Sequence, residues 1–134
     1  MKSNHQVGLS SINIETSIFL DRNFSFSEAL VTHLRRLDLS YHEIGVLLNR
    51  DDRTIWTLCR RAQKKSGHLE KEGIVQIKTA IPTSIFKDRS ISIMEALVEH
   101  LRERYSYREI GKMLNRNERT IWTIYDRVKK KRKN

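Results

Sequence analysis

The 134-residue chain contains a single cysteine, a single proline and five glycines. One cysteine, Cys59, excludes an internal disulfide and a cysteine-rich zinc site, and it is typical of a reducing compartment. The five histidines are scattered, and none is paired with a second metal ligand at a suitable spacing. The sequence therefore predicts neither a disulfide scaffold nor a metal site, and we expect no cofactor.

Long apolar runs are also missing. No stretch approaches the roughly 20 residues that a membrane helix needs, and the N-terminus lacks the apolar core of a secretion signal. We therefore expect a cytoplasmic protein that makes no membrane contact. No segment resembles a positioned nucleophile with its base, or a glycine loop for phosphate, so we expect a protein without catalytic residues. No ligand-sensing domain and no small-molecule ligand are evident either.

Positive charge is abundant instead. The chain has 26 Lys and Arg against 16 Asp and Glu, and its formal net charge is +10. Six of these bases fall within residues 127–134, where there is no acid. Such basicity is typical of nucleic-acid binding, although a basic helix end also complements the helix dipole.

An internal repeat is the strongest signal in the sequence. Residues 14–37 align with 81–104, with 15 of 24 positions identical, and residues 40–65 align with 106–131, with 16 of 26 identical. Between these blocks the offset falls from 67 to 66, which places one extra residue near Asp38 in the first copy. Because an insertion that leaves both flanks intact belongs in a loop, we expect a turn there.

Each copy has the pattern of three helices. The first two helices begin with a Ser followed three residues later by Glu, the signature of a capping box. The four pairs are Ser25 with Glu28, Ser40 with Glu43, Ser92 with Glu95, and Ser106 with Glu109. A short second helix then ends at Asn49 or Asn115, because Asn tolerates the left-handed conformation of a tight turn.

In the first helix of the first copy, Phe26, Leu30, Leu34 and Leu37 recur at helical spacing. The third helices have one apolar stripe each, formed by Ile55, Leu58 and Ala62 in the first copy and by Ile121, Ile124 and Val128 in the second. Gly45 and Gly111 lie in the second helices, where a small residue permits close crossing by the third. Before each first helix runs an arm, "IETSIFLDR" or "IPTSIFKDR". Pro82 makes the second arm irregular in our interpretation, and alternation near Val75, Ile77 and Ile81 suggests a short strand.

We thus predict an all-α fold of two tandem three-helix units with minor strand content. Residues 1–66 form the first unit with its arm, 67–80 a linker, and 81–134 the second unit with a basic tail. Copies of roughly 50 residues are near the lower limit for independent folding, so we expect them to pack on each other or on a partner.

The repeated string "YxEIGxxLNRxxRTIWTxxxR" resembles the helix-turn-helix of region 4 of bacterial sigma factors and of related transcription regulators. Glu43-Ile44-Gly45 and Glu109-Ile110-Gly111 match the family's Glu-Ile-small step. Thr54-Ile55 and Thr120-Ile121 match the start of its recognition helix. The resemblance covers about 25 residues in each copy, and it implies DNA binding through the third helix. Arg50, Arg116, Trp56 and Trp122 depart from the family pattern.

Recognition helices place their N-terminal residues near base edges in the major groove. Arg53 and Arg119 are the best candidates for bidentate contact with guanine, and Thr57 and Thr123 for a thymine methyl group or a phosphate. Arg50 and Arg116 in the turn are predicted to hold phosphates. Lys64, Lys65 and the tail from Lys129 onward, which includes Lys130 and Lys131, are predicted to add contacts to the DNA backbone. The remaining predicted DNA contacts are Arg60, Trp56 and Trp122. For the arginines the alternative is solvation or pairing with Glu43 and Glu109, and for the tryptophans it is packing against the arm or the other unit.

The function that we expect is sequence-specific binding of double-stranded DNA by two heads, in a transcription regulator that associates with the nucleoid. Alternatives are an architectural DNA-binding protein and a helix-turn-helix module for protein–protein assembly. The sequence is also compatible with a homodimer. Because residues 67–79 span at most about 43 Å when extended, the linker reaches between adjacent major grooves, which predicts a bipartite site about 20 base pairs long. Since Asp126 replaces Arg60, its halves are related but unequal.

Overall fold

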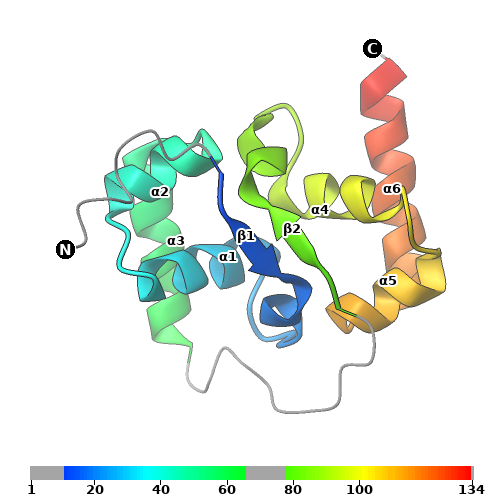
Figure 1. Cartoon of the computed structure of the whole chain (residues 1–134), viewed down its shortest axis with the longest axis horizontal. Coiled ribbons are helices and arrows are strands. Elements are labelled where there is room, and N and C mark those ends of the chain that lie inside the picture. The colour runs from blue at the N-terminus through cyan, green and yellow to red at the C-terminus, as the bar shows by residue number, and fades with distance from the viewer. Residues whose placement is uncertain (1–10, 66–77, 134) are drawn as a thin grey trace.

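The computed structural model describes residues 11–65 and 78–133. Over these ranges the chain is mostly helical, as predicted, and it adds one small sheet of two strands (Figure 1). The elements, with 3-10 helices written η, are β1 (Asn13–Glu15), η2 (Thr16–Phe19), α1 (Phe26–Arg36), α2 (Tyr41–Leu48), α3 (Asp52–Lys64), β2 (Ala80–Pro82), η3 (Thr83–Lys87), α4 (Ile93–Leu101), α5 (Tyr107–Leu114) and α6 (Glu118–Lys133).

The four capping boxes predicted from sequence are all present. In α1, α2, α4 and α5 the N-cap Ser accepts from the backbone N–H of the Glu three residues on, and that Glu accepts from the backbone of the Ser. The Ser40 N–H, for example, lies 2.7 Å from Oε1 of Glu43. Each box satisfies two N–H groups that the first helical turn leaves without partners.

The turns also follow the sequence. Asn49 and Asn115 end α2 and α5 in the left-handed conformation, each with φ of 56°. Asp38, with φ of 71°, lies between α1 and α2. Arg35 donates to the carbonyl of Leu39, and in the second copy Arg102 donates to the carbonyl of Tyr105. These matched bonds place the extra residue between Arg35 and Leu39, and the left-handed conformation of Asp38 between α1 and α2 confirms a turn there.

The arms of the two copies pair with each other. Strands β1 and β2 are antiparallel, and Ile14 lies opposite Ile81, its own equivalent in the repeat. The Thr16 N–H donates to the Thr79 carbonyl at 3.0 Å, and the Thr83 N–H donates to the Ile12 carbonyl at 2.8 Å. Because each contact recurs with the copies exchanged, the two copies are related by an approximate two-fold axis through this sheet.

The expectation that the second arm is irregular is wrong. Pro82 ends strand β2, and β1 and β2 are the only strands of the sheet over the described residues. Proline is tolerated at the end of an edge strand, where its missing N–H interrupts no ladder. A 3-10 helix follows directly, as it does after β1.

The arms also join the two copies into one core. Helix η2 packs on α1 of its own copy and on α5 of the other, and η3 packs on α4 and on α2 in the same manner. Phe19 and Phe86, one from each arm, are fully buried. The buried residues of both copies form a single hydrophobic cluster. The copies thus pack on each other, which is one of the two arrangements expected for units of this size.

Two residues of the predicted apolar stripes lie elsewhere. Leu37 is 45% exposed, because α1 ends one residue before it. Leu58 is half-buried, whereas Cys59 beside it is buried in the core.

The predicted linker falls mostly within residues 66–77, outside the described part of the chain, as do Val75 and Ile77. The predicted unit boundaries stay predictions.

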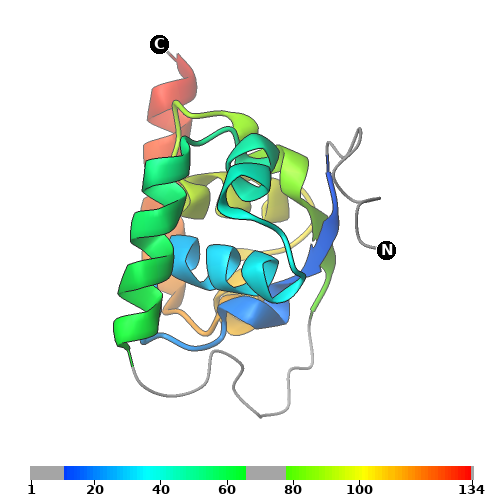
Figure 2. The same ribbon diagram turned by 90° about the vertical axis from the view of Figure 1, so that its left-hand side faces the viewer.

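Helices α3 and α6 lie on the same side of the molecule, and the two strands lie on the opposite side (Figure 2). Figure 1 shows the two helices apart, running in opposite directions, with α1 and α4 between them. In the described part of the chain, no helix has the length and apolar character that crossing a membrane requires.

The two helical glycines are required by the turn that follows each of them. A Cβ at Gly45 would lie 2.6 Å from the carbonyl oxygen of Arg50, and one at Gly111 would lie 2.7 Å from that of Arg116. The tight turn that folds back on the second helix therefore excludes a side chain at both positions. The sequence had suggested only that the nearby third helix would do so. Since the obstructing atoms are backbone, they move only if the turn itself changes.

Replacing Gly111 by Ala is expected to lower the free energy of unfolding by about 1–3 kcal/mol, as overpacking does. Lys112→Ala is the matched control, because Lys112 is the exposed next residue of the same helix. Urea unfolding followed by circular dichroism measures both. Equal stability of the two variants would contradict the proposed role of the glycine.

Candidate nucleic-acid interface

Helix α3 presents a basic outer face. Ile55, Cys59 and Ala62 point into the core. On the opposite side, at helical spacing, lie Arg53, Thr57, Arg60 and Lys64. The three bases among them are exposed, and Thr57 is half-buried. The predicted DNA contacts of the first copy thus share one continuous face of one helix.

Helix α6 presents the equivalent face with a different charge. Ile121, Ile124 and Val128 are buried, and the outer side has Arg119, Thr123, Asp126 and Lys130. Asp126 pairs with Lys130, whose Nζ lies 3.2 Å from its carboxylate. Of the two bases on this face, Lys130 is thus paired with an acid of the same face, and Arg119 is not. The two faces have the same layout but unequal charge.

The two tryptophans lie at the edge of these faces. The indole of Trp56 is 48% exposed and that of Trp122 is 51% exposed, and neither belongs to the hydrophobic core cluster. Packing against the arm or the other copy therefore does not account for them. In the first copy the guanidinium of Arg60 lies 5.3 Å from the centre of the Trp56 ring, a cation–π distance. Asp126 replaces this arginine in the second copy.

The threonine hydroxyls are used within their own helices. Thr57 Oγ1 donates to the Arg53 carbonyl at 2.9 Å, and Thr123 Oγ1 donates to the Arg119 carbonyl at 3.0 Å. The hydroxyl proton is thus committed, which disfavours donation to a phosphate. This geometry favours the other predicted contact, in which the threonine methyl meets the methyl group of thymine.

Arg50 and Arg116, predicted as phosphate contacts, lie between the two copies. Nη1 of Arg50 donates to the Leu48 carbonyl at 2.8 Å and the Phe86 carbonyl at 2.9 Å, and Nη2 donates to the Ile91 carbonyl at 3.3 Å. Two of these acceptors belong to the other copy. Burial lowers the pKa of Arg50, and the nearby Arg89 lowers it further.

Arg116 makes the reciprocal contacts. It donates to the Leu114 carbonyl at 2.8 Å, and to the carbonyls of Phe19 and Phe24 in the first copy at 3.3 and 3.4 Å. Burial lowers its pKa in the same way. Most N–H donors of both guanidinium groups thus form hydrogen bonds to backbone carbonyl oxygens. We leave Arg50 and Arg116 out of the interface that we propose.

The neighbouring asparagines complete this contact. Nδ2 of Asn49 donates to the Lys87 carbonyl, and Nδ2 of Asn115 donates to the Leu20 carbonyl, each at 2.8 Å. The repeated Asn-Arg pair therefore serves as a clamp on the arm of the other copy. Sequence reasoning missed this role, and its one signal was that both copies keep the pair unchanged.

Two lysines near the helix ends are also committed. Lys65 pairs with Glu28, and Lys131 pairs with Glu95 at 2.8 Å. Both carboxylates are buried. Burial would raise the pKa of Glu95, but the hydrogen bonds from Lys131 and from the Ser92 backbone hold the pKa below its ordinary value. These lysines, predicted to add contacts to the DNA backbone, instead neutralise buried acids.

The basic tail is partly committed as well. Arg132 forms ion pairs at 2.7 Å with both Asp88 and Glu99. Together with Ser90, this arginine lowers the pKa of Asp88 to about 2. Lys129 and Lys133 remain as exposed cations of the tail that form no ion pair with a described residue, whereas Lys130 pairs with Asp126. A role of the tail in binding therefore falls mainly to Lys129 and Lys133.

Compared with models of protein families, with curated proteins and with solved structures, the chain shows no match. In residues 11–65 and 78–133, no three side chains of His, Cys, Asp and Glu gather in a way that would hold a metal ion. Burial raises the pKa of Cys59, so its thiol stays protonated in the core.

If Arg116 holds the arm of the other copy, its replacement should lower the free energy of unfolding more than replacement of Arg119, three residues further on. Arg116→Met leaves the carbonyls of Phe19 and Phe24 without their donor, and we expect a loss of about 2–3 kcal/mol in the free energy of unfolding. Arg119→Met, on the exposed face, is expected to change it by less than about 0.5 kcal/mol. Urea unfolding measures both, and Arg50→Met should match Arg116→Met. Equal losses at 116 and 119 would refute the clamp.

Proposed function

We propose that the chain binds double-stranded DNA with the outer faces of α3 and α6. In this proposal α1–α3 and α4–α6 are two three-helix units. Each contains a helix-turn-helix, formed by α2 and α3 in the first unit and by α5 and α6 in the second, with the third helix as the recognition helix. The observation that carries the proposal is that α3 and α6 lie on one side of the molecule (Figure 2), and that each has an exposed arginine, Arg53 or Arg119, near its start.

The approximate two-fold axis indicates how the two half-sites of the target DNA are oriented relative to each other. A tandem duplication joined by a flexible linker fits direct or inverted half-sites equally well. Here α3 and α6 run in opposite directions (Figure 1), as the recognition helices of symmetric dimers do. Protein two-fold symmetry is mirrored by operators that are inverted repeats. We therefore propose an imperfect inverted repeat, recognised by one chain acting as a pseudo-dimer.

The spacing of the half-sites is fixed by packing. The sequence suggested that the reach of the linker would set it. Because the arms cross between copies and share one core, the distance between α3 and α6 is instead a property of the folded body. A rigid body tolerates little variation in this spacing. If the two helices enter successive major grooves on one side of the duplex, the half-sites lie about one helical turn apart, which is roughly 34 Å.

The charge difference between the faces supports unequal halves. The first face has three bases, Arg53, Arg60 and Lys64. In the second, Asp126 neutralises Lys130, so direct reading rests on Arg119. We propose that the first half-site contains more guanine than the second, because Arg is the usual partner of guanine in the major groove.

Protein assembly is the second candidate function. The half-exposed indoles of Trp56 and Trp122 favour it, because Trp is enriched among the residues that dominate protein interfaces. The two candidates respond differently to salt. Binding to DNA releases counterions and weakens steeply as salt rises, whereas an interface anchored by indoles is much less sensitive.

Replacing Arg53 and Arg119 together by Ala is expected to weaken binding to a duplex selected from a random pool by about 1–3 kcal/mol for each contact. The loss arises because each guanidinium then no longer meets its base. Fluorescence anisotropy at fixed salt measures the affinity. Arg104→Ala, an exposed arginine outside the two faces, is the control and should bind like the parent. A folded double variant with unchanged affinity would rule out this interface.

The half-site arrangement is tested separately. The selected half-sites are rebuilt as an inverted repeat, as a direct repeat, and as an inverted repeat with 5 base pairs inserted between the halves. The inverted repeat should bind more tightly than both others, because the insertion turns one half to the opposite side of the duplex. Equal affinity for all three duplexes would mean that only one helix reads DNA.

A further inference from the structure

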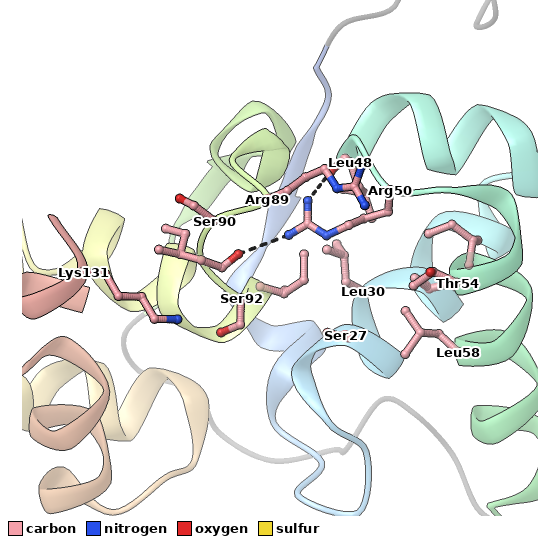
Figure 3. Close-up of a pocket in the computed structure, with 14 residues that line it drawn as sticks. Ser27, Leu30, Leu48, Arg50, Thr54, Leu58, Arg89, Ser90, Ser92 and Lys131 are labelled. Carbon is pink, nitrogen blue, oxygen red and sulfur yellow. Dashed lines mark hydrogen bonds between the residues drawn. The ribbon is translucent and has the colours of Figure 1, made fainter. Parts of the chain in front are cut away.

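A cavity of about 410 Å³ opens where the two copies meet (Figure 3). One wall comes from α1 and α3, and the other comes from the segment between η3 and α4 together with the end of α6. Its volume lies within the range of about 300–1,000 Å³ that small-molecule sites occupy. The proposed DNA contacts Arg53, Thr57 and Arg60 do not line it. The cavity is therefore separate from the interface described above.

The cavity combines an apolar floor with a cationic rim. Leu30, Ile55 and Ile93 are among the apolar residues that line it. Figure 3 shows Arg50 and Arg89, one from each copy, next to each other at one end, and Lys131 at the other. Arg50 is tied to backbone carbonyls and Lys131 to Glu95.

Arg89 is the uncommitted member of this rim. Its side chain is exposed and makes no hydrogen bond or ion pair with any described residue, although its charge helps to lower the pKa of the nearby Asp51, after the hydrogen bonds from Thr54. It lies close enough to Arg50 for the two positive charges to repel each other. An anion between the apolar floor and this pair would relieve the repulsion and accept hydrogen bonds from Arg89.

The repeat provides an internal comparison. The equivalents of Ser27, Ile91 and Ile93 in the other copy are Met94, Phe24 and Phe26, all of them larger. There Phe24 and Phe26 are buried, and the Arg116 guanidinium stacks on the Phe26 ring at 4.6 Å.

The third helices show the same difference. Ile124 is 2% exposed, whereas its equivalent Leu58, which lines the cavity, is half-buried. Three smaller side chains thus leave open on one side a space that larger side chains fill on the other. The cavity is a local departure from the two-fold symmetry of the molecule.

We propose that this cavity is a binding site for a small organic anion, with one acidic group and an apolar body. The acidic group is held by Arg89 at the rim, and the apolar body lies on Leu30, Ile55 and Leu58. An inorganic anion or a DNA phosphate would leave this floor uncovered, and a neutral hydrocarbon would give the Arg89 guanidinium no hydrogen-bond acceptor. Binding requires no DNA, so the site is tested independently of the proposed function.

The probe is 1-anilinonaphthalene-8-sulfonate, an aromatic sulfonate whose fluorescence rises when it leaves water. The parent chain should bind it saturably with one site per chain. Arg89→Ala should weaken binding about tenfold, the effect of losing one charged hydrogen bond. Arg22→Ala is the matched control, because Arg22 is the equivalent of Arg89 beside the filled side, and it should bind like the parent. Equal weakening in both variants, or no saturable binding by the parent, would overturn the proposal.

A second variant fills the cavity with the side chains that occupy the equivalent positions in the repeat. Ser27→Met, Ile91→Phe and Ile93→Phe together should abolish probe binding while Arg89 and both tryptophans remain. If the triple variant fails a thermal-unfolding check, Ser27→Met alone serves, and it should weaken binding at least several-fold. Retained binding in a folded, filled variant would place the probe elsewhere. Inorganic phosphate should compete weakly with the probe, and full displacement at equal concentration would show that the apolar floor contributes nothing.

Discussion

The guanidinium groups of Arg50 and Arg116 hold the two halves of this molecule against each other. Each reaches from the turn after a second helix to carbonyl oxygens in the other copy, one in the arm and one just after it, at 2.9–3.4 Å. These hydrogen bonds tie each turn to the backbone of the other copy. The arrangement of the two copies is consistent with these reciprocal contacts between each turn and the other copy. The arms are drawn across the axis, Phe19 and Phe86 enter the common core, and α3 and α6 come to lie on one side.

These reciprocal contacts also explain how so small a repeat folds. A unit of roughly 50 residues buries too little apolar surface to be comfortably stable alone. The arm of each copy packs on a helix of the other copy, and each arm contributes one strand to the shared sheet. The covalent link between the copies keeps this partner at high effective concentration. Duplication within one chain thus achieves what symmetric dimers achieve by association.

Local features of the fold were predictable from sequence, and contacts between the copies were not. A capping box joins residues three apart, and the left-handed turn at Asn49 depends on that residue alone, so both could be predicted. The Phe86 and Ile91 carbonyls that Arg50 reaches lie 36 and 41 residues away. No local pattern distinguishes an arginine with such partners from one that faces water or phosphate. Arg53 and Thr57 were placed on the outer face of their helix because helical periodicity alone decides that position.

The central claim is that one rigid chain presents both α3 and α6 to a single duplex. Nuclear magnetic resonance tests it most directly, with the isotope-labelled full chain titrated by its selected duplex. The account predicts that amide signals shift along both helices together, from Arg53 to Lys64 and from Arg119 to Lys130, and saturate at one duplex per chain. Signals of β1 and β2, on the opposite side, should stay in place. Shifts confined to one of the two helices, or centred on the strands, would contradict the account.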